Sequence, residues 1–318
     1  MNDIVNPTAL TNFKVYGYCV PCEVGSPADF ENKPPEPGFV GTETFVKDED
    51  GKWGLTSNPK YWKTNYSYRF AAYSNGNTTH PNVTYDPAED KLTIPEYTVY
   101  DAENAKTSGN EPKDLLAAIA GDKHSANAGT APNLQFRHLL SKITIYINNA
   151  SANAVMKVTK AIISGMKTMG TCVCTYTTVP ADRYPKNIVW NSLTGDEDFD
   201  LGTLDINSKH SSTELTFYVI PQPNASLKLT MSWDETINGE VHNPIVDEEF
   251  SLASGKTSVR ADYEVNNQWV PGYHYQYTLV RGTDFGEIKF NVTGIDDWNS
   301  DLDRTEEDDD INLTPVTP

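Results

Sequence analysis

The sequence is poor in basic residues, in cysteine and in long hydrophobic runs. It has 25 Lys and Arg residues against 44 Asp and Glu residues, which gives a formal net charge of −19. Nucleic acids and anionic lipid surfaces select basic proteins, so this charge argues against both as partners. No apolar run has the length of a transmembrane helix, and no signal-peptide pattern opens the chain. The first residues are compatible with a mature chain from which an export signal has been removed.

Helical periodicity is also scarce, and one segment alone predicts a helix. This segment is 108–125, which carries Pro112 near its start and apolar side chains at Leu116 and Ile119. Gly121 is suited to end such a helix. We therefore expect one short helix in the first half of the chain.

The residues that are abundant predict an all-β protein. The 17 Tyr, 11 Phe and 6 Trp residues fit half-buried strands, and the 20 Gly and 20 Pro residues supply turns. Many short strands separated by turn signals indicate sandwiches or barrels. The expected strand segments are 11–20, 42–55 (a hairpin), 61–76, 91–100, 133–150, 157–166, 172–179, 188–193, 199–207, 212–223, 225–236, 244–253, 269–282 and 286–298. Within 269–282, Pro271-Gly272 predicts a turn, followed by a strand with Tyr273, Tyr275 and Tyr277 on one face.

The length and the patterning predict two domains and a tail. A chain of 318 residues accommodates two domains of about 150 residues each. The hydrophobic period changes at His138, so we place an N-terminal β-sandwich at 1–137 and a C-terminal β-sandwich at 138–299. Residues 300–318 are acidic and have lost both alternation and aromatics, so we expect a solvated C-terminal tail.

An ordered set of segments then points to a family. In chain order they read FKVYGY, GKWGL, YWKTNYSYRFAAY, DLLAA, LQFRHLLSKITIYI, LTFYVIPQP, WVPGYHYQYTL and IKFNVTGIDDWN. The most specific are F-x-H-x-L-S-K-I at 136–143 and W-x-P-G-x-x-Y-x-Y at 269–277. With these segments the chain resembles the fimbrillin-like proteins of Bacteroidales, the pilin superfamily of type V fimbriae, from about Phe13 to Asn299.

The resemblance implies two transthyretin-like β-sandwich domains with Greek-key connections. It implies export as a lipoprotein, with an anchor that is removed from this sequence, and display at the outer membrane as a fimbrium. It further implies assembly with other fimbrial subunits by β-strand donation, in which a partner's strand completes an open sheet edge. A host protein or a glycan would be the target of adhesion, and no cofactor is implied.

The sequence departs from the shaft members of this family. Shaft subunits are activated by an arginine-directed protease that removes an N-terminal strand, yet the first arginine here is Arg69, inside an expected strand. Lys47 and Lys52 are the candidate processing positions in the region where a releasable strand would end. The segment 311–316 is the one tail segment that could donate a strand. These features favour a tip, anchor or accessory subunit over a shaft subunit.

The cysteines Cys19, Cys22, Cys172 and Cys174 admit several readings. A redox dithiol needs a helix N-terminus that prolines after Cys22 forbid, and a zinc site needs four converging ligands from two different expected domains. A local disulfide between the first two cysteines stays open in an exported protein, and we favour buried thiols for the second two. Their redox state is left undetermined by the sequence.

The acidic end of the chain resembles a calcium loop in part. Asp297, Asn299, Asp301, Asp303 and Asp308 have the spacing of oxygen ligands in such a loop. The sixth position is not glycine, the last is not glutamate, and no flanking helix is expected. We therefore favour a solvated acidic tail, with no metal site.

No catalytic motif is apparent. The six histidines are scattered, G-x-S-x-G is missing, and no pair of carboxylates stands out for glycoside hydrolysis. The alternative to a fimbrial subunit is a monomeric surface protein that binds glycans through exposed aromatic rings. The candidate stacking residues are Trp53, Trp62, Trp233 and Trp298. The sequence thus predicts a non-enzymatic, exported β-sandwich protein with a structural and adhesive function.

Overall fold

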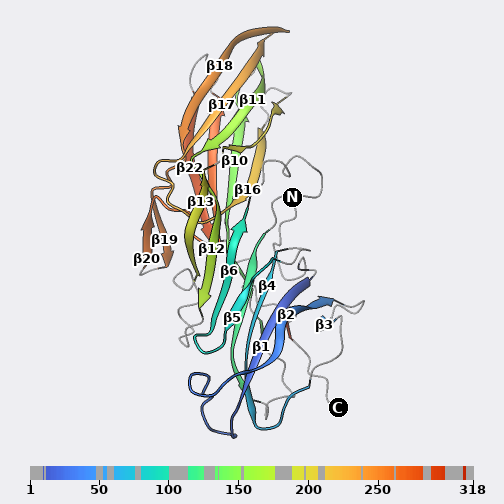
Figure 1. Cartoon of the computed structure of the whole chain (residues 1–318). Helices are drawn as coiled ribbons and strands as arrows, with labels where there is room; N and C mark the ends of the chain where they lie inside the picture. The colour runs from blue at the N-terminus through green and yellow to red at the C-terminus, as the bar shows by residue number, and fades with distance from the viewer. Residues whose placement is uncertain are drawn as a thin grey trace.

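The computed structural model describes residues 10, 12–47, 53–55, 61–75, 80–99, 114–124, 133–134, 136–151, 154–175, 188–196, 198–206, 212–237, 239–260, 263–281, 288–297 and 311–312. All regular elements within these ranges are β-strands, as the composition predicts. No helix in these ranges is long and apolar enough to cross a membrane. Figure 1 shows an elongated molecule, with β1–β4 at one end and the hairpin of β17 and β18 at the other.

The first half of the chain builds a six-stranded sheet in the order β3-β2-β1-β4-β7-β9. Phe13 in the central strand β1 is fully buried, and its ring contacts Phe45, Trp53 and Phe136 at centroid distances of 5.3, 4.8 and 5.3 Å. Aromatic side chains of β1, β2 and β4 thus fill one face of this sheet. The strands are β1 (Asn12–Pro21), β2 (Glu36–Lys47), β3 (Trp53–Leu55), β4 (Tyr66–Ser74), β7 (Leu116–His124) and β9 (Arg137–His138).

The predicted helix at 108–125 is wrong over its described part, because Leu116–His124 forms strand β7. Leu116 and Ala118 pack in the core around Phe13, whereas Leu115 and Ala117 pack in the larger core on the other side. A strand buried on both faces reads as a continuous apolar run, which resembles a buried helix in sequence. Sheet pairing with β4 therefore overrides the local helical preference. Residues 108–113 of the predicted helix lie outside the described residues.

A four-stranded sheet in the order β13-β12-β6-β5 joins the two halves of the chain. Cys172 pairs with Ile94 and Cys174 with Leu92, so β12 and β6 are hydrogen-bonded neighbours across the predicted boundary at 138. That boundary stays a prediction, and it does not coincide with a break between sheets. The strands are β5 (Thr84–Asp86), β6 (Lys91–Thr98), β12 (Lys167–Thr175) and β13 (Ile188–Asp196).

The second half contributes two further sheets. One has the order β16-β10-β21-β22 and includes a parallel pair, β10 with β21. The other has the order β14-β11-β17-β18, with β15 also paired to β11. Their strands are β10 (Ser141–Asn149), β16 (Ser212–Val219), β21 (Tyr273–Arg281), β22 (Ile288–Asp297), β11 (Ala154–Ser164), β14 (Phe199–Asp200), β15 (Leu204–Ile206), β17 (Lys228–Ile237) and β18 (Glu240–Ser251).

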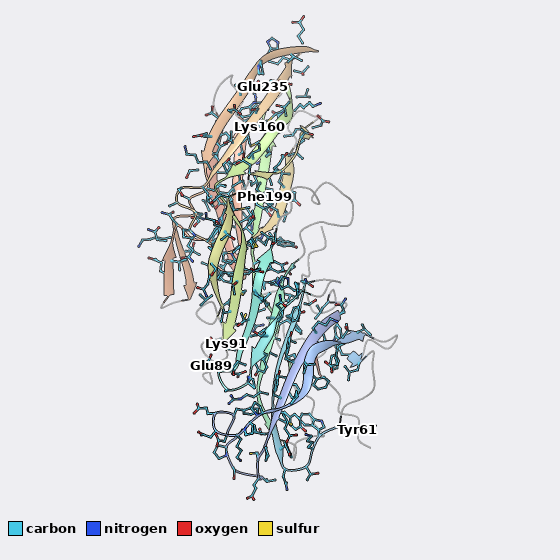
Figure 2. All side chains as sticks on the ribbon, viewed as in Figure 1. Tyr61, Glu89, Lys91, Lys160, Phe199 and Glu235 are labelled. Atoms are coloured by element: carbon cyan, nitrogen blue, oxygen red, sulfur yellow. The ribbon has the colours of Figure 1, made fainter. Side chains whose placement is uncertain are left out.

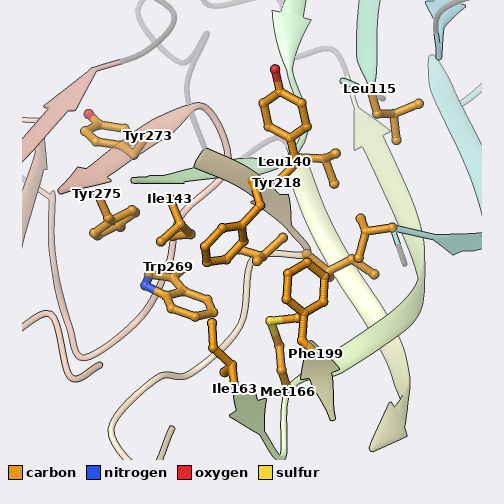
Figure 3. Close-up of a cluster of buried hydrophobic side chains, with 14 of the residues drawn as sticks. Leu115, Leu140, Ile143, Ile163, Met166, Phe199, Tyr218, Trp269, Tyr273 and Tyr275 are labelled. Carbon is orange, nitrogen blue, oxygen red and sulfur yellow. The ribbon is translucent and has the colours of Figure 1, made fainter. Parts of the chain in front are cut away.

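The core of the second half is built around the predicted aromatic strand. Tyr273, Tyr275 and Tyr277 alternate on one face of β21 and are all buried, as the sequence predicts. The Trp269 indole donates to the Tyr277 hydroxyl at 3.0 Å, and this hydroxyl donates to the Leu252 carbonyl at 2.7 Å. Burial raises the pKa of Tyr277 above its ordinary value. Figure 3 shows Trp269 and Tyr275 in this core, close to Ile143 of β10.

Two small pairs of strands complete the fold. The hairpin of β19 (Lys256–Arg260) and β20 (Tyr263–Asn266) projects from the side of the molecule in Figure 1. Strand β8 (Asn133–Leu134) pairs with β23 (Ile311–Asn312), which lies in the C-terminal tail. The C-terminal tail therefore pairs with a strand from the first half of the chain.

Candidate functional site

The outer edge of β7 is the first feature that bears on the predicted strand donation. On one side, β7 pairs with β4 along its whole length, from Leu116 opposite Ser74 to His124 opposite Ser67. On the other side, β9 pairs only with Leu116 and Ala117. Among the described residues, 118–124 have no hydrogen-bonded strand partner on this side, although β8 lies close to β7. Such an edge presents backbone N–H and C=O groups to an incoming strand.

The C-terminal tail pairs with a strand next to this edge. Ile311 lies opposite Leu134 and Asn312 opposite Asn133 in an antiparallel register, and Leu134 is buried. Strand β8, which carries Leu134, in turn contacts β7. The predicted donor segment 311–316 therefore starts as a strand on its own chain, and its last four residues lie outside the described residues.

The candidate processing positions, Lys47 and Lys52, come after β1 and β2 in the chain, and β1 is a central strand of the first sheet. Strand β1 is paired on both sides, with β2 and with β4. Lys47 ends β2 opposite Trp53, and Lys52 lies outside the described residues. A cut between them would leave β1 and β2 as one N-terminal fragment. Its release would uncover the β4 edge and the apolar face on which Phe13 packs.

Arg69, the first arginine of the chain, is held by the folded structure. It lies in β4, its Nη1 donates to the Pro87 carbonyl at 2.7 Å, and its guanidinium lies 4.4 Å from the ring centroid of Phe30. A protease needs an extended and accessible segment, which a paired central strand does not provide. Cleavage at Arg69 would therefore require β4 to leave the sheet.

The four candidate stacking tryptophans lie in different environments. Trp233 is fully buried in β17, so the interior position contradicts a stacking role for this ring. Trp53 is half-buried against Phe13, and Trp62 is half-buried against Tyr68 at a centroid distance of 4.5 Å. Trp298 lies outside the described residues.

Sequence reasoning missed Tyr61 next to Trp62. Its side chain keeps 52% of its surface exposed. The run YWKTNY could have indicated this exposure, because a lysine, a threonine and an asparagine separate its aromatic residues.

The four cysteines are buried, and none of them forms a disulfide. The Cys172 and Cys174 sulfur atoms lie 3.9 Å apart on one face of β12, and burial raises the pKa of the Cys172 thiol. Burial also raises the pKa of the Cys19 thiol. Thiols of this kind are protonated and poor nucleophiles, so the buried-thiol interpretation of Cys172 and Cys174 agrees with the structure.

No group of three or more His, Cys, Asp or Glu side chains among the described residues could hold a metal ion. Of the candidate calcium ligands, Asp297 ends β22, and Asn299, Asp301, Asp303 and Asp308 lie outside the described residues.

Two buried pairs of polar side chains were not predicted from the sequence. His138 Nδ1 lies 2.7 Å from a carboxyl oxygen of Asp114, and both side chains are fully buried where β9 meets β7. Arg281 donates through Nε and Nη2 to the two Glu235 oxygens at 2.8 and 2.7 Å. The partners lie far apart in the sequence, and no local pattern marks them. Both pairs join segments that are distant in the chain, which gives them a structural function.

Comparison with known proteins supports this architecture. The fimbrillin-like family matches residues 29–298 of the chain. A fimbrial protein from Bacteroides vulgatus has a similar fold, with a TM-score of 0.63 and 17% identity over 90% of this chain and 92% of that one. A putative cell adhesion protein from Bacteroides uniformis matches with a TM-score of 0.46 and 16% identity, over 91% of each chain.

The tip fimbrial protein Mfa3 from Porphyromonas gingivalis, with a C-terminal truncation, matches with a TM-score of 0.39 and 14% identity, over 92% of this chain and 96% of that one. None of the curated protein sequences matches the chain significantly. The family match covers most of the chain, and the fold of the Bacteroides vulgatus protein agrees with it. The chain therefore belongs to the fimbrillin-like family.

Proposed function

We propose that this protein is a fimbrial subunit of the tip, anchor or accessory type, which assembles with other subunits by β-strand donation at the cell surface. The observation that carries the proposal is the unpaired outer edge of β7, which lies beside a C-terminal segment that already forms a strand. An edge of this kind accepts an extended segment through backbone hydrogen bonds. The segment 311–316 is a donor of suitable length for a neighbouring subunit.

The finer features of the family belong to this proposal as well. They include transthyretin-like sandwiches at 1–137 and 138–299, an acidic tail at 300–318, and a lipoprotein anchor at the outer membrane. Strands β5 and β6 of the first region would then pack on the second. A non-enzymatic, adhesive function is in keeping with the fimbrial and adhesion proteins among the structures of similar fold.

The pairing of β23 with β8 suggests how the donor is held before assembly. Among the described residues, the pairing joins Ile311 with Leu134 and Asn312 with Asn133. In this proposal the tail leaves its own chain and pairs with a neighbouring subunit in the same way. The absence of an accessible arginine near the first strand argues that release of β1 is not the trigger, which favours an end or accessory position over the shaft.

The test is a comparison of two C-terminal truncations by size-exclusion chromatography with light scattering. One variant lacks 311–318, and a matched control lacks 313–318 and keeps Ile311–Asn312. If the tail donates a strand, a labelled peptide of residues 311–318 binds the first variant, and a peptide of the same composition in scrambled order does not. Equal binding of both peptides, or of neither, would contradict strand donation by the tail.

A second arm tests processing. Limited trypsin treatment followed by mass spectrometry shows whether a fragment ending at Lys47 or Lys52 is released, and light scattering shows whether the remainder forms oligomers. Release of the fragment together with oligomer formation would support a role as a shaft subunit. If β1 is retained and the protein stays monomeric, protease-activated polymerisation is contradicted and the tip, anchor or accessory role is supported.

A further inference from the structure

We propose that the chain binds a saccharide at a cluster of aromatic and charged side chains at one end of the first sheet. The cluster, called the aromatic platform below, consists of Tyr61, Trp62, Lys63 and Tyr66 together with Glu36 of β2. This proposal concerns adhesion rather than assembly, and it does not depend on strand donation.

Two rings of the platform present surface to solvent. Tyr61 is 52% exposed, and Figure 2 shows it at the margin of the molecule near the end of the first sheet. Trp62 is half-buried, and its ring is held edge to face by Tyr68 at 4.5 Å and by Phe70 at 5.9 Å. A ring that is fixed by its neighbours and still partly exposed offers a rigid contact surface at little cost in conformational entropy.

A cluster of charged and hydroxyl groups forms around Lys63, the residue that follows Trp62 in the chain. The Glu36 carboxylate pairs with the Lys63 ammonium and accepts a hydrogen bond from the Tyr66 hydroxyl at 3.0 Å. The hydrogen bond from Lys63 lowers the pKa of the Glu36 carboxyl, with Tyr66 acting in the same direction. The Lys63 ammonium also lies 5.2 Å from the centroid of the Tyr66 ring. Both charged side chains remain about half exposed, at 49% and 44%.

This combination matches the chemistry of a sugar ring. A pyranose has an apolar C–H face, which packs on an aromatic ring, and a rim of hydroxyl groups, which donate to carboxylates and accept from ammonium groups. Tyr61 and Trp62 supply the first kind of contact, and Glu36 and Lys63 supply the second. The strongly acidic chain disfavours nucleic acid at the same aromatic surface, because phosphate would be repelled.

The other described candidate tryptophans pack against the cores of the fold. Trp233 is fully buried. Trp53 is half-buried and packs against Phe13 at a centroid distance of 4.8 Å. The platform differs in that the half-exposed Tyr61 lies next to Trp62 in the chain, beside the exposed Lys63–Glu36 pair.

The experiment uses the full chain on an array of neutral and sialylated oligosaccharides, followed by titration of the strongest ligand with tryptophan fluorescence as the readout. The variants are Tyr61→Ala and Glu36→Gln, which change exposed side chains, and the control is Val241→Ala, which changes an exposed side chain of β18. We expect both platform variants to lose at least about tenfold in affinity. The control should bind like the parent chain.

Two results would overturn the proposal. One is the absence of saturable binding to any oligosaccharide on the array. The other is unchanged affinity in Tyr61→Ala, with thermal unfolding confirming that the variant is folded. Light scattering on the same variants separates this proposal from strand donation. A variant that loses sugar binding but still assembles is defective at the aromatic platform and not in assembly.

Discussion

The ion pair between Arg281 and Glu235 allows a quantitative test of how the second half is held together. Arg281 ends β21 and Glu235 lies in β17, so the pair connects two different sheets. Its two hydrogen bonds measure 2.8 and 2.7 Å, and the side chains are only 5% and 13% exposed. Removing one partner of such a pair leaves the other charge buried without compensation.

The predicted cost of Arg281→Ala follows from this geometry. Breaking a buried pair costs about 3–5 kcal/mol, and the slight exposure of Glu235 places this case near the lower end, at about 3 kcal/mol. In a chain of this size, each kcal/mol corresponds to roughly 2–4 °C in Tm. We therefore expect the midpoint of thermal unfolding to fall by roughly 6–12 °C.

Calorimetry and urea unfolding would measure this effect, with a double-mutant cycle as the control. Replacing both partners, in Arg281→Met with Glu235→Leu, removes the unpaired charge and should restore most of the stability. The reasoning would be refuted if Arg281→Ala cost less than about 1 kcal/mol, the range of an exposed pair. It would also fail if the double variant were no more stable than Arg281→Ala, since the cost would then come from lost packing.

Further predictions rest on single features of the fold. Arg281 lowers the pKa of Glu235, so the stability that the pair contributes should be complete above the unfolded value of about 4.3 and decline as pH falls through the lowered folded value; Arg281→Met should remove this part of the acid dependence in urea midpoints. His138→Ala removes the imidazole that contacts the fully buried Asp114 carboxyl group and should cost about 1–3 kcal/mol by urea unfolding, whereas adding Asp114→Ala should recover part of the loss. Gly17→Ala places a Cβ 2.7 Å from the Phe39 ring and 2.9 Å from the Phe70 ring, and should cost about 1–3 kcal/mol, with an unchanged Tm as the contrary result.

The sequence supports local inferences where a strand has one buried face. Strand β1 at Asn12–Pro21 lies within one residue of the expected segment 11–20, and β21 begins directly after the predicted Pro271-Gly272 turn. Gly272 has a φ of +74°, the left-handed conformation that glycine adopts without strain. Its N–H donates to the Leu140 carbonyl at 2.8 Å. In these places alternation and turn chemistry agree, so local information is sufficient.

The sequence fails where tertiary packing decides the outcome. Strand β7 was expected to be helical because its two buried faces hide the strand period. The candidate site shows the same limit. An unpaired strand edge is a property of the sheet around β7, and the exposure of Tyr61 against the burial of Trp233 depends on neighbours that are distant in sequence. The sequence identifies the aromatic residues that could bind a sugar, but it does not show which of them are exposed.

The pairing of β6 with β12 ties the two halves of the chain together. Leu92 and Ile94 of β6 are fully buried in the same core as Leu279 of β21 and Met231 of β17. Each such side chain contributes about 1.5–3 kcal/mol on burial, which is a large part of a typical total stability of about 5–15 kcal/mol. The second half therefore depends for its core on a strand from the first half, so unfolding of either half should destabilise the other.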